Sequence, residues 1–545
     1  MSNHSLNPHA PLRHWQIITP IGTDPLFLRP LALDETIFHY LLGQPCLDPQ
    51  LQGLVKPLTL KQTTLPPSHQ ALATRLITAW SSPNPPVVQL VGSDFAAKAT
   101  IAAISTQQLG FSLLTIPAHL LPQETTALQE FCQRLERQTI LGRSLVFLDC
   151  RQILESDGLA EKFFSQLIEQ LPTPFLINSP KPKQISQPCL ILEVNPPTKG
   201  EQLQLWQTAL GDVATNLETE LASLAYQYNL DLPTIQTICT QTLTELNLSN
   251  SPRELLPSLR QNCHRLVRPA LQGLAQHIET KADWEDLILP EKEKNILEEI
   301  VAQVTYRKTV SADWGWAGKG QRGQAMVAVF AGASGTGKTM AAELIGKRTG
   351  LDVYRIDLAA VVSKYIGETE KHLGQIFDGA ERGGAILLFD EGDALFGKRT
   401  EVKDSRDRYA NLSVSYLLQR LEAYGGLAII TTNWEESLDK AFKRRFRHIV
   451  QFPMPDKETR KLLWQRIFPQ ATPTHQLNFT ELAKMHISGG HIRSIALNAC
   501  FLAVKIGQPV TMKQVAIAAR GEYIKLDLGN MDSFTQRWLK EAELS

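Results

Sequence analysis

The residues whose types and spacing most clearly indicate a chemical role form a glycine-rich segment: Gly332, Ala333, Ser334, Gly335, Thr336, Gly337, Lys338 and Thr339. An apolar run precedes this segment and a helical pattern follows it, which is the context of a phosphate-binding loop (P-loop). The glycines would let successive N–H groups converge on phosphate oxygens, and the helix N-terminus would add its dipole. We expect Lys338 to reach the β- and γ-phosphates of ATP and the Thr339 hydroxyl to bind Mg²⁺. The alternative is a glycine–serine surface loop with a chance lysine.

Two acids and an asparagine follow later apolar runs. Asp390 and Glu391 end the run that starts at 385, and Asn433 ends the run that starts at 426. Asp390 should support Mg²⁺ directly or through water, and Glu391 should polarise the attacking water. Asn433 would orient that water or sense the γ-phosphate. A solvated loop start is the other interpretation of the acid pair, and the upstream P-loop argues against it.

These candidates require elements that bring the ends of several strands together. Continuous apolar runs are typical of parallel strands covered on both faces, and helical segments alternate with them here. The pattern predicts an α/β fold with a doubly wound parallel sheet, whose ligand site lies at the carboxyl ends of the strands.

The first half of the chain contains a weaker version of the same pattern. Gly92 and Lys98 stand in register with the P-loop, but Ala97 and Ala99 replace its last glycine and its hydroxyl residue. Another apolar strand ends in Asp149, and Cys150 stands where a hydrolytic glutamate would be needed. We predict a duplicated nucleotide-binding fold that has lost catalysis; the alternative is an unrelated α/β domain with a coincidental lysine.

Composition excludes several classes of protein. The 545 residues carry 55 basic and 55 acidic side chains, so charge gives no reason to expect nucleic acid or an anionic membrane as a partner. The beginning of the sequence lacks a signal-peptide pattern, and no apolar run is long enough to span a bilayer. Seven dispersed cysteines suggest reduced thiols. We expect a cytoplasmic protein.

From about residue 271 to 545, the motifs resemble an AAA+ ATPase of the AAA clade. The resemblance implies a C-terminal helical lid and a homo-hexameric ring. Arg444 and Arg445 match arginines that reach the neighbouring subunit's ATP, although the usual Pro-Gly between them is missing, so which arginine serves is left open. Arg493 resembles a lid arginine that contacts the γ-phosphate, and Ile288 is a further candidate for nucleotide binding.

The segment Lys364, Tyr365, Ile366 and Gly367 resembles the loop that lines the central pore of AAA unfoldases. Tyr365 would insert between side chains of a protein client, since its rigid ring loses little rotamer entropy. The plainer interpretation is a helix N-terminal turn with favourable acids at 368 and 370. The loop 398–408 is either a second pore loop or a solvated connector.

As a whole, the chain resembles the ATPases encoded with bacterial phage-tail-like contractile injection systems. We expect a small N-terminal docking or packing segment (1–70), a degenerate AAA-like domain (71–270), an ATPase large subdomain (271–455) and a helical lid (456–545). The resemblance implies that Mg-ATP hydrolysis drives remodelling or threading of a protein client, with components of the injection system among its partners. An ATP-dependent assembly platform or switch that does not thread is the alternative. A DNA-handling motor is disfavoured by the neutral charge, and salt-sensitive DNA binding would revive it.

Overall fold

A computed structural model describes most of the chain. The described residues are 10–22, 28–44, 46–59, 64–122, 124–152, 158–170, 174–249, 255–268, 271, 273–316, 325–358, 369–393, 405–433, 445–525 and 538. The chain divides into two compact units: the first comprises Met1–Ala225 with Leu230–Thr244, and the second comprises Tyr226–Asn229 with Glu245–Ser545. No helix in these described ranges is both long and apolar enough to cross a membrane.

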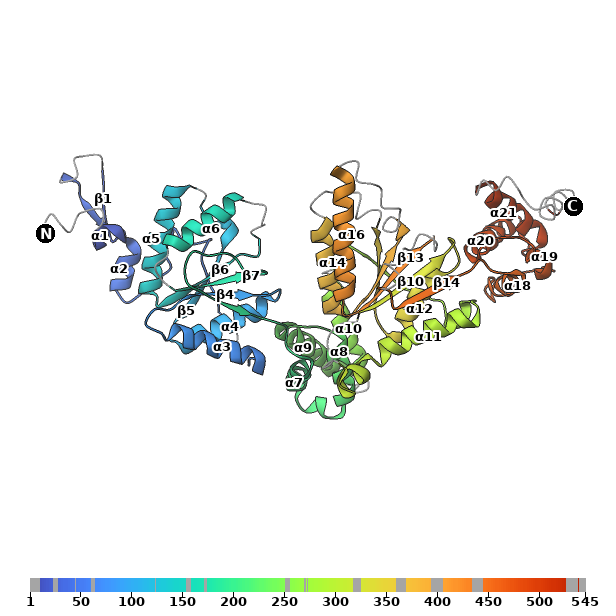
Figure 1. Ribbon diagram of the computed structural model, residues 1–545, viewed down its shortest axis with the longest axis horizontal. Helices are drawn as coiled ribbons and strands as arrows, with labels where there is room; N and C mark the ends of the chain where they lie inside the picture. The colour runs from blue at the N-terminus through green and yellow to red at the C-terminus, as the bar shows by residue number, and fades with distance from the viewer. Residues whose placement is uncertain are drawn as a thin grey trace. The chain divides into compact units, whose positions relative to one another are not determined.

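The second unit is built on a six-stranded sheet (Figure 1). Its strands are β9 (Gln276–Ile278), β10 (Met326–Gly332), β11 (Val353–Asp357), β12 (Ile386–Asp390), β13 (Leu427–Thr432) and β14 (His448–Phe452). The spatial order is β14-β10-β13-β12-β11-β9, and all pairs are parallel except the edge pair β11–β9. The central strands are buried along almost their whole length, because helices cover both faces.

Two pairs of helices cover the two faces of this sheet. Helices α11 (Glu291–Thr305) and α12 (Lys338–Thr349) pack on one face through residues such as Leu297 and Ile345. Helices α14 (Thr369–Gly383) and α16 (Ser405–Ala423) pack on the other through residues such as Phe377 and Leu417. The predicted doubly wound α/β fold is confirmed.

A small helical subdomain ends the second unit. It contains α18 (Lys457–Arg466), α19 (Phe479–Leu482), α20 (Gly489–Lys505) and α21 (Met512–Lys525). These helices have their own core around the fully buried Trp464. The Asp456 carboxylate caps α18 by accepting from the Thr459 N–H at 2.8 Å. These helices lie within the stretch 456–545 in which we predicted a lid.

The first unit repeats the sheet of the second. Its strands are β3 (Lys56–Pro57), β4 (Val87–Val91), β5 (Ser112–Pro117), β6 (Ser144–Asp149), β7 (Phe175–Ser179) and β8 (Cys189–Glu193). The order is β3-β5-β6-β7-β4-β8, with β3 alone antiparallel. In each sheet the five parallel strands can be numbered in chain order. Read across the sheet towards the antiparallel edge strand, their order is fifth, first, fourth, third and second in both sheets.

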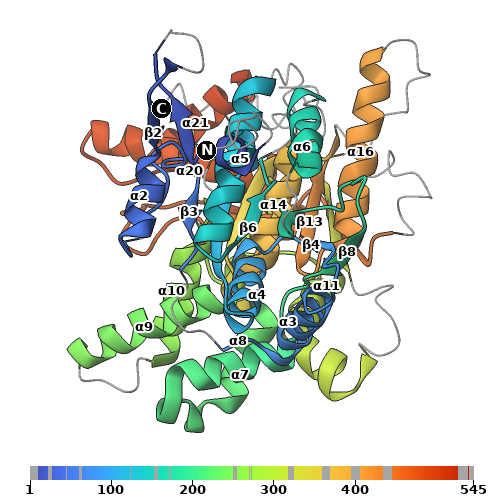
Figure 2. The ribbon, with the colours of Figure 1, turned by 90° about the vertical axis from the view of Figure 1, so that its left-hand side faces the viewer.

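Helices again cover both faces of this first sheet, as Figure 2 shows. Helices α3 (Pro67–Trp80) and α4 (Phe95–Gln108) lie on one face, and α5 (Thr125–Leu141) and α6 (Gly158–Gln170) lie on the other. The two units therefore share layers as well as strand order, which is the topology that the duplication hypothesis requires.

The N-terminal part consists of short elements attached to this unit. They are α1 (Pro11–His14), β1 (Ile18–Pro20), β2 (Leu31–Leu33) and α2 (Glu35–Leu41). Arg137 on α5 is almost completely buried and donates to Asp48 at 2.6 Å and to the carbonyls of Trp15 and Gln16. Leu51 and Val55 belong to the core of the first sheet, and α3 begins at Pro67. The boundary predicted at residue 70 thus falls inside α3, because the preceding segment already packs into the unit.

A run of helices connects the two sheets: α7 (Lys199–Leu210), α8 (Glu218–Gln227), α9 (Leu232–Ser249) and α10 (Leu255–Val267). Thr198 and Glu201 form a reciprocal capping box at the start of α7. Helix α10 belongs to the second unit, where the His264 Nδ1 lies 2.7 Å from an Asp352 carboxylate oxygen. The division between units therefore precedes the boundary that we predicted at residue 270. The remaining short helices are Ala118–Leu120, Gly211–Asn216, Trp284–Asp286 and Thr309–Asp313.

Candidate functional site

The P-loop has the backbone geometry that its glycines allow. Gly335 and Gly337 have φ of +77° and +103°, a region in which residues with a Cβ are strained. Gly332 has φ of +155°, and a Cβ at this position would collide with the carbonyl of Phe452 on β14. Helix α12 then begins at Lys338. The loop between β10 and α12 is therefore shaped by left-handed backbone, and it offers its N–H groups beside a helix N-terminus.

Lys338 lies in this loop with its amine among oxygen acceptors. Its Nζ donates to the carbonyls of Gly332 and Ala333 at 2.5 and 3.0 Å and to Oδ1 of Asn433 at 3.1 Å. Partial burial lowers the pKa of Lys338, and the nearby carboxylates of Asp390 and Asp393 oppose that shift. A half-buried ammonium near Asn433 is positioned to meet a phosphate that bridges the P-loop and the end of β13.

Asp390 ends β12 and is held from three sides. One carboxylate oxygen accepts from the Thr431 hydroxyl and from the Glu391 N–H at 3.2 Å. The other lies 2.6 Å from the Arg355 guanidinium, which comes from the neighbouring strand β11. Asp390 and Thr339 line the same cavity and supply oxygen donors, which Mg²⁺ prefers. This small donor set fits a Mg²⁺ ion that takes its remaining ligands from water and phosphate.

Glu391 is exposed and has φ of +58°, one of few non-glycine residues of the described chain in the left-handed region. Such backbone strain concentrates at functional sites, where it aims a side chain. The turn is held by the Gly392 N–H, which donates to the Thr431 carbonyl at 2.8 Å. The carboxylate therefore leaves the sheet edge at the cavity instead of continuing the line of β12.

Asn433 is oriented by an acid that the sequence analysis did not single out. Asp393 accepts from the Asn433 N–H at 3.0 Å and from its side-chain Nδ2 at 3.1 Å, and also from the Thr432 hydroxyl. These bonds leave Oδ1 of Asn433 facing Lys338. The geometry places the asparagine between the P-loop lysine and Asp393, three residues after the end of β12.

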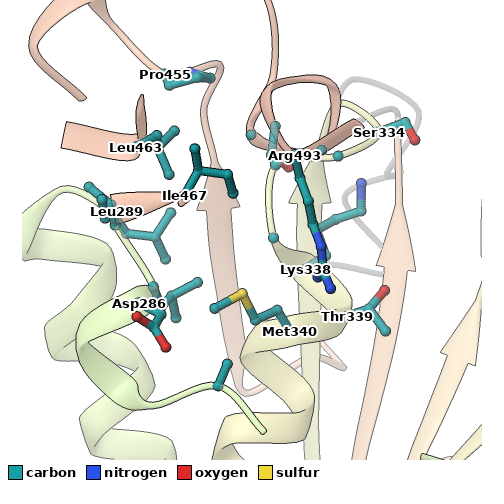
Figure 3. Close-up of a pocket in the computed structure, with 18 of the residues that line it drawn as sticks. Asp286, Leu289, Ser334, Lys338, Thr339, Met340, Pro455, Leu463, Ile467 and Arg493 are labelled. Atoms are coloured by element: carbon teal, nitrogen blue, oxygen red, sulfur yellow. The ribbon is translucent and has the colours of Figure 1, made fainter. Parts of the chain in front are cut away.

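Lys338, Thr339, Asp390, Glu391 and Asn433 line a cavity of about 1040 Å³ at the carboxyl ends of the strands. Figure 3 shows Lys338, Thr339 and Arg493 on one side and Leu289, Leu463 and Ile467 on the other. The first side carries the cationic side chains of Lys338 and Arg493, as a triphosphate would require, and the second offers apolar side chains for a base, with Asp286 beside them. Of the predicted site residues, the lining includes Ile288, Ser334, Gly335, Thr336, Gly337, Lys338, Thr339, Asp390, Glu391, Asn433 and Arg493.

The lid contacts the P-loop directly. The Gly490 N–H at the start of α20 donates to the Gly335 carbonyl at 2.8 Å, and Gly490 has no Cβ to separate the two backbone segments. On the opposite side, the Arg466 guanidinium of α18 donates to the Glu285 carbonyl at 2.5 Å. The lid is thus fastened to the large subdomain at both ends of the cavity, and it carries Arg493 into the site.

Several predicted residues are not placed in this cavity. Lys364, Tyr365, Ile366, Gly367 and Arg444 lie outside the described residues. Arg445 is described and lies 3.2 Å from the carboxylate of Glu422 at the end of α16, away from the cavity lining. The trans role of the two arginines and the pore role of Tyr365 remain predictions.

The structure adds Arg355, Thr431 and Asp393 to the site. Asp393 lies three residues after Asp390, so its position in the acidic segment was an available signal. Arg355 is a basic residue in an otherwise largely apolar strand, but nothing in its sequence context names Asp390 as its partner. Pairing between neighbouring strands decides that contact.

Comparison with known families agrees with this geometry. Residues 328–454 match the ATPase family associated with various cellular activities (AAA), and this stretch contains the P-loop, Asp390, Glu391 and Asn433. The second unit therefore carries an AAA ATPase domain. Residues 198–269 match the contractile injection system ATPase helical domain, which covers α7 to α10. The chain thus contains an AAA ATPase domain and the helical domain of contractile injection system ATPases, and both predicted resemblances are confirmed.

Curated relatives match about a third of the chain. The proteasome-activating nucleotidase of Methanoregula boonei is 30% identical over 36% of this chain and 48% of its own length. Proteasome-activating nucleotidase 1 of Haloferax volcanii is 31% identical over 32% of this chain and 45% of its own. The probable 26S proteasome regulatory subunit 4 of Caenorhabditis elegans is 29% identical over 32% and 42%, respectively. The chain spans about half the length of these relatives.

Proposed function

We propose that this protein is a ring-forming, cytoplasmic ATPase that couples Mg-ATP hydrolysis to remodelling or threading of a protein client in a contractile injection system. One observation carries the hydrolytic part. Lys338, Asp390, Glu391 and Asn433 come from three strand ends and converge on one cavity within an AAA ATPase domain. That combination is what ATP hydrolysis requires.

The residues have separable roles in this reaction. The P-loop N–H groups and Lys338 hold the phosphates, while the apolar wall formed by Leu289, Leu463 and Ile467 accepts the base. Thr339 and Asp390 would hold Mg²⁺, which offsets charge on the phosphate oxygens. Glu391 accepts a proton from the attacking water, whose oxygen bonds to the γ-phosphorus as the bond to ADP breaks.

Substitution of the two central residues tests hydrolysis. Glu391→Gln keeps the shape of the site and removes the base, so ATP binding should persist while turnover falls by about 10²–10⁴-fold. Lys338→Ala should lose nucleotide affinity. Turnover at the wild-type rate by Glu391→Gln would exclude it as the base, and normal ATP binding by Lys338→Ala would contradict the P-loop assignment.

The proposed ring rests on Arg444 and Arg445. A planar guanidinium can donate several hydrogen bonds to the charged phosphate oxygens. In the family that the sequence resembles, such an arginine reaches the ATP of the neighbouring subunit. Arg445 is half-exposed and is not among the described residues that line its own cavity. These facts support donation to a second copy, and a homo-hexamer is the proposed assembly.

The client part of the proposal has two sources of support. The helical domain matches one described for contractile injection system ATPases, and the curated relatives are named as activators or subunits of proteasomes. Components of an injection particle are therefore our proposed clients, handled during its assembly or turnover. The alternative is a platform or switch that binds and releases structural proteins without threading them.

Tyr365→Ala separates these two readings. Under threading, the variant should hydrolyse ATP normally but lose client remodelling, because the aromatic side chain that grips the client is gone. Tyr365→Phe is the matched control, since it keeps the aromatic ring. Full remodelling by Tyr365→Ala would exclude threading and leave the platform reading.

A further inference from the structure

The first unit repeats the fold of the ATPase unit, so its residues can be compared with the active site position by position. Gly92 corresponds to Gly332: its φ is +145°, and a Cβ there would collide with the Val194 carbonyl that follows β8. The connection from β4 to α4 therefore starts with the same backbone conformation and the same close approach as the connection from β10 to α12. The differences between the two sites begin directly after this glycine.

The loop that would bind phosphate has become helix. Phe95 and Ala97 stand in place of Gly335 and Gly337, and α4 begins at Phe95, three residues before Lys98. The Ala97 N–H donates to the Asp94 carboxylate at 2.9 Å, and Asp94 is the N-cap of the helix. A carboxylate of the chain thus takes a backbone donor that a P-loop offers to phosphate.

Lys98 is withdrawn from any ligand. Its side chain is completely buried, and its Nζ donates to the Gly92 carbonyl at 2.5 Å and to the Ser179 carbonyl at 3.0 Å. Gly92 directly follows β4, and Ser179 ends β7. The lysine joins two strand ends of its own sheet, whereas Lys338 reaches Asn433 in a cavity.

The metal and water positions are also taken. Asp149 accepts from Asn178 at 2.7 Å and from the Nε and Nη2 atoms of Arg151 at 3.0 and 2.7 Å. The Arg151 guanidinium lies 3.7 Å from the centre of the Phe95 ring. Cys150, in the position of Glu391, is completely buried, and burial raises the pKa of its thiol to about 12.

We propose that the first unit is a self-occupied pseudo-site that binds no nucleotide. The Asp94 carboxylate accepts from a backbone N–H, the buried Lys98 amine donates to two carbonyls, and the Arg151 guanidinium donates to Asp149, all where phosphate and metal would lie. Each chain then holds one nucleotide, at residues 332–339; this count rests on the proposed function, but the closed first site does not.

Counting bound nucleotides tests the proposal. Calorimetric titration of the full chain with Mg-ADP should give one site per chain, and Lys338→Ala should give none. Arg151→Ala removes an exposed side chain of the first site and should leave both the count and the affinity unchanged. Lys98→Met should also bind one nucleotide per chain. If Lys98→Met does not fold, Arg151→Ala answers the same question.

Two results would overturn the proposal: two sites in the wild-type chain, or one site in Lys338→Ala that Lys98→Met or Arg151→Ala weakens. A wild-type chain that binds no nucleotide would instead contradict the proposed ATPase function while agreeing with the closed first site. The two ideas therefore fail separately.

Discussion

Individual residues of the site depend on partners from neighbouring strands. Lys338 and Asn433 are hydrogen-bonded, and Asp393 fixes the asparagine through its backbone and side chain. The Thr431 hydroxyl and the Arg355 guanidinium fix the carboxylate of Asp390. Precise orientation matters because a misplacement of about 1 Å can cost a hundredfold in rate.

Asp393→Ala is the sharpest test of this orientation. We expect kcat for ATP hydrolysis to fall by up to about a hundredfold while nucleotide affinity is retained, since the P-loop is untouched. Asp393→Asn keeps one oxygen acceptor and should recover much of the rate. Steady-state kinetics with parallel ADP titrations would measure both quantities. Equal loss of affinity and rate would show a general structural role instead.

At the scale of elements, the contact between the P-loop and the start of α20 couples the lid to the nucleotide. A Cβ at Gly490 would lie 2.9 Å from the Gly335 Cα, so the two backbones approach only because both residues are glycine. A Cβ at Gly335 would lie 2.5 Å from Ser488 Oγ, which is hydrogen-bonded to His491 at 3.0 Å. Opening or closing of the lid must therefore act on the phosphate end of the cavity.

Gly490→Ala should push α20 away from the P-loop. We expect weaker ADP binding and slower hydrolysis, measured by titration and by phosphate release. Gly521→Ala on α21 is the matched control, because nothing lies within 4 Å of its added Cβ. That variant should be stabilised by about 0.5–1 kcal/mol with unchanged affinity. An unchanged affinity in Gly490→Ala would separate the lid contact from nucleotide binding.

The buried Lys98 predicts a pH dependence of the first unit. Burial lowers its pKa from 10.5 to about 8, against the opposing charges of Asp149 and Asp94; Arg151 lowers it further, and Cys150 raises it. Between these two values the unfolded chain holds a proton that the folded chain has released. Raising the pH from 8 towards 10.5 therefore favours the folded state.

Denaturant unfolding of the full chain at pH 8 and pH 10 would measure this effect. Wild type should gain stability relative to Lys98→Met over that interval, because the variant has no proton to lose. Lys56→Met, at an exposed position, should behave like wild type. A constant difference between wild type and Lys98→Met would contradict titration of this lysine.

At the scale of the molecule, the chain combines one closed unit with one open catalytic unit. Only the second has a described cavity lined by a P-loop, two acids and a lid arginine. If Arg444 or Arg445 acts between copies, the neighbouring subunit completes each ATP site, and assembly of the ring depends on bound nucleotide.

Solution mass of Glu391→Gln tests that coupling. Adding Mg-ATP should convert the 60.8 kDa chain to one discrete ring-sized species, because ATP is retained at the interface. Arg444→Ala and Arg445→Ala in the same background should show which arginine the ring needs. A monomer with and without Mg-ATP would remove the trans-arginine assignment first.

The sequence by itself determined the catalytic motif, the α/β class and the weak repeat. Local backbone requirements decide these features: glycines at left-handed positions before Lys338, and apolar runs that must be buried on both faces. The helical lid and the lid arginine followed from resemblance to a family with a similar pattern.

Only the tertiary structure decided which side chains meet across the sheet. Arg355 and Asp390 are 35 positions apart, and Lys338 and Asn433 are 95 apart; strand order alone brings them together. The same is true of the first unit, where the sequence showed lost glycines but not Arg151 on Phe95 or Lys98 between two strand ends. Spacing along a chain records local backbone geometry, whereas a site is closed or open according to contacts made through space.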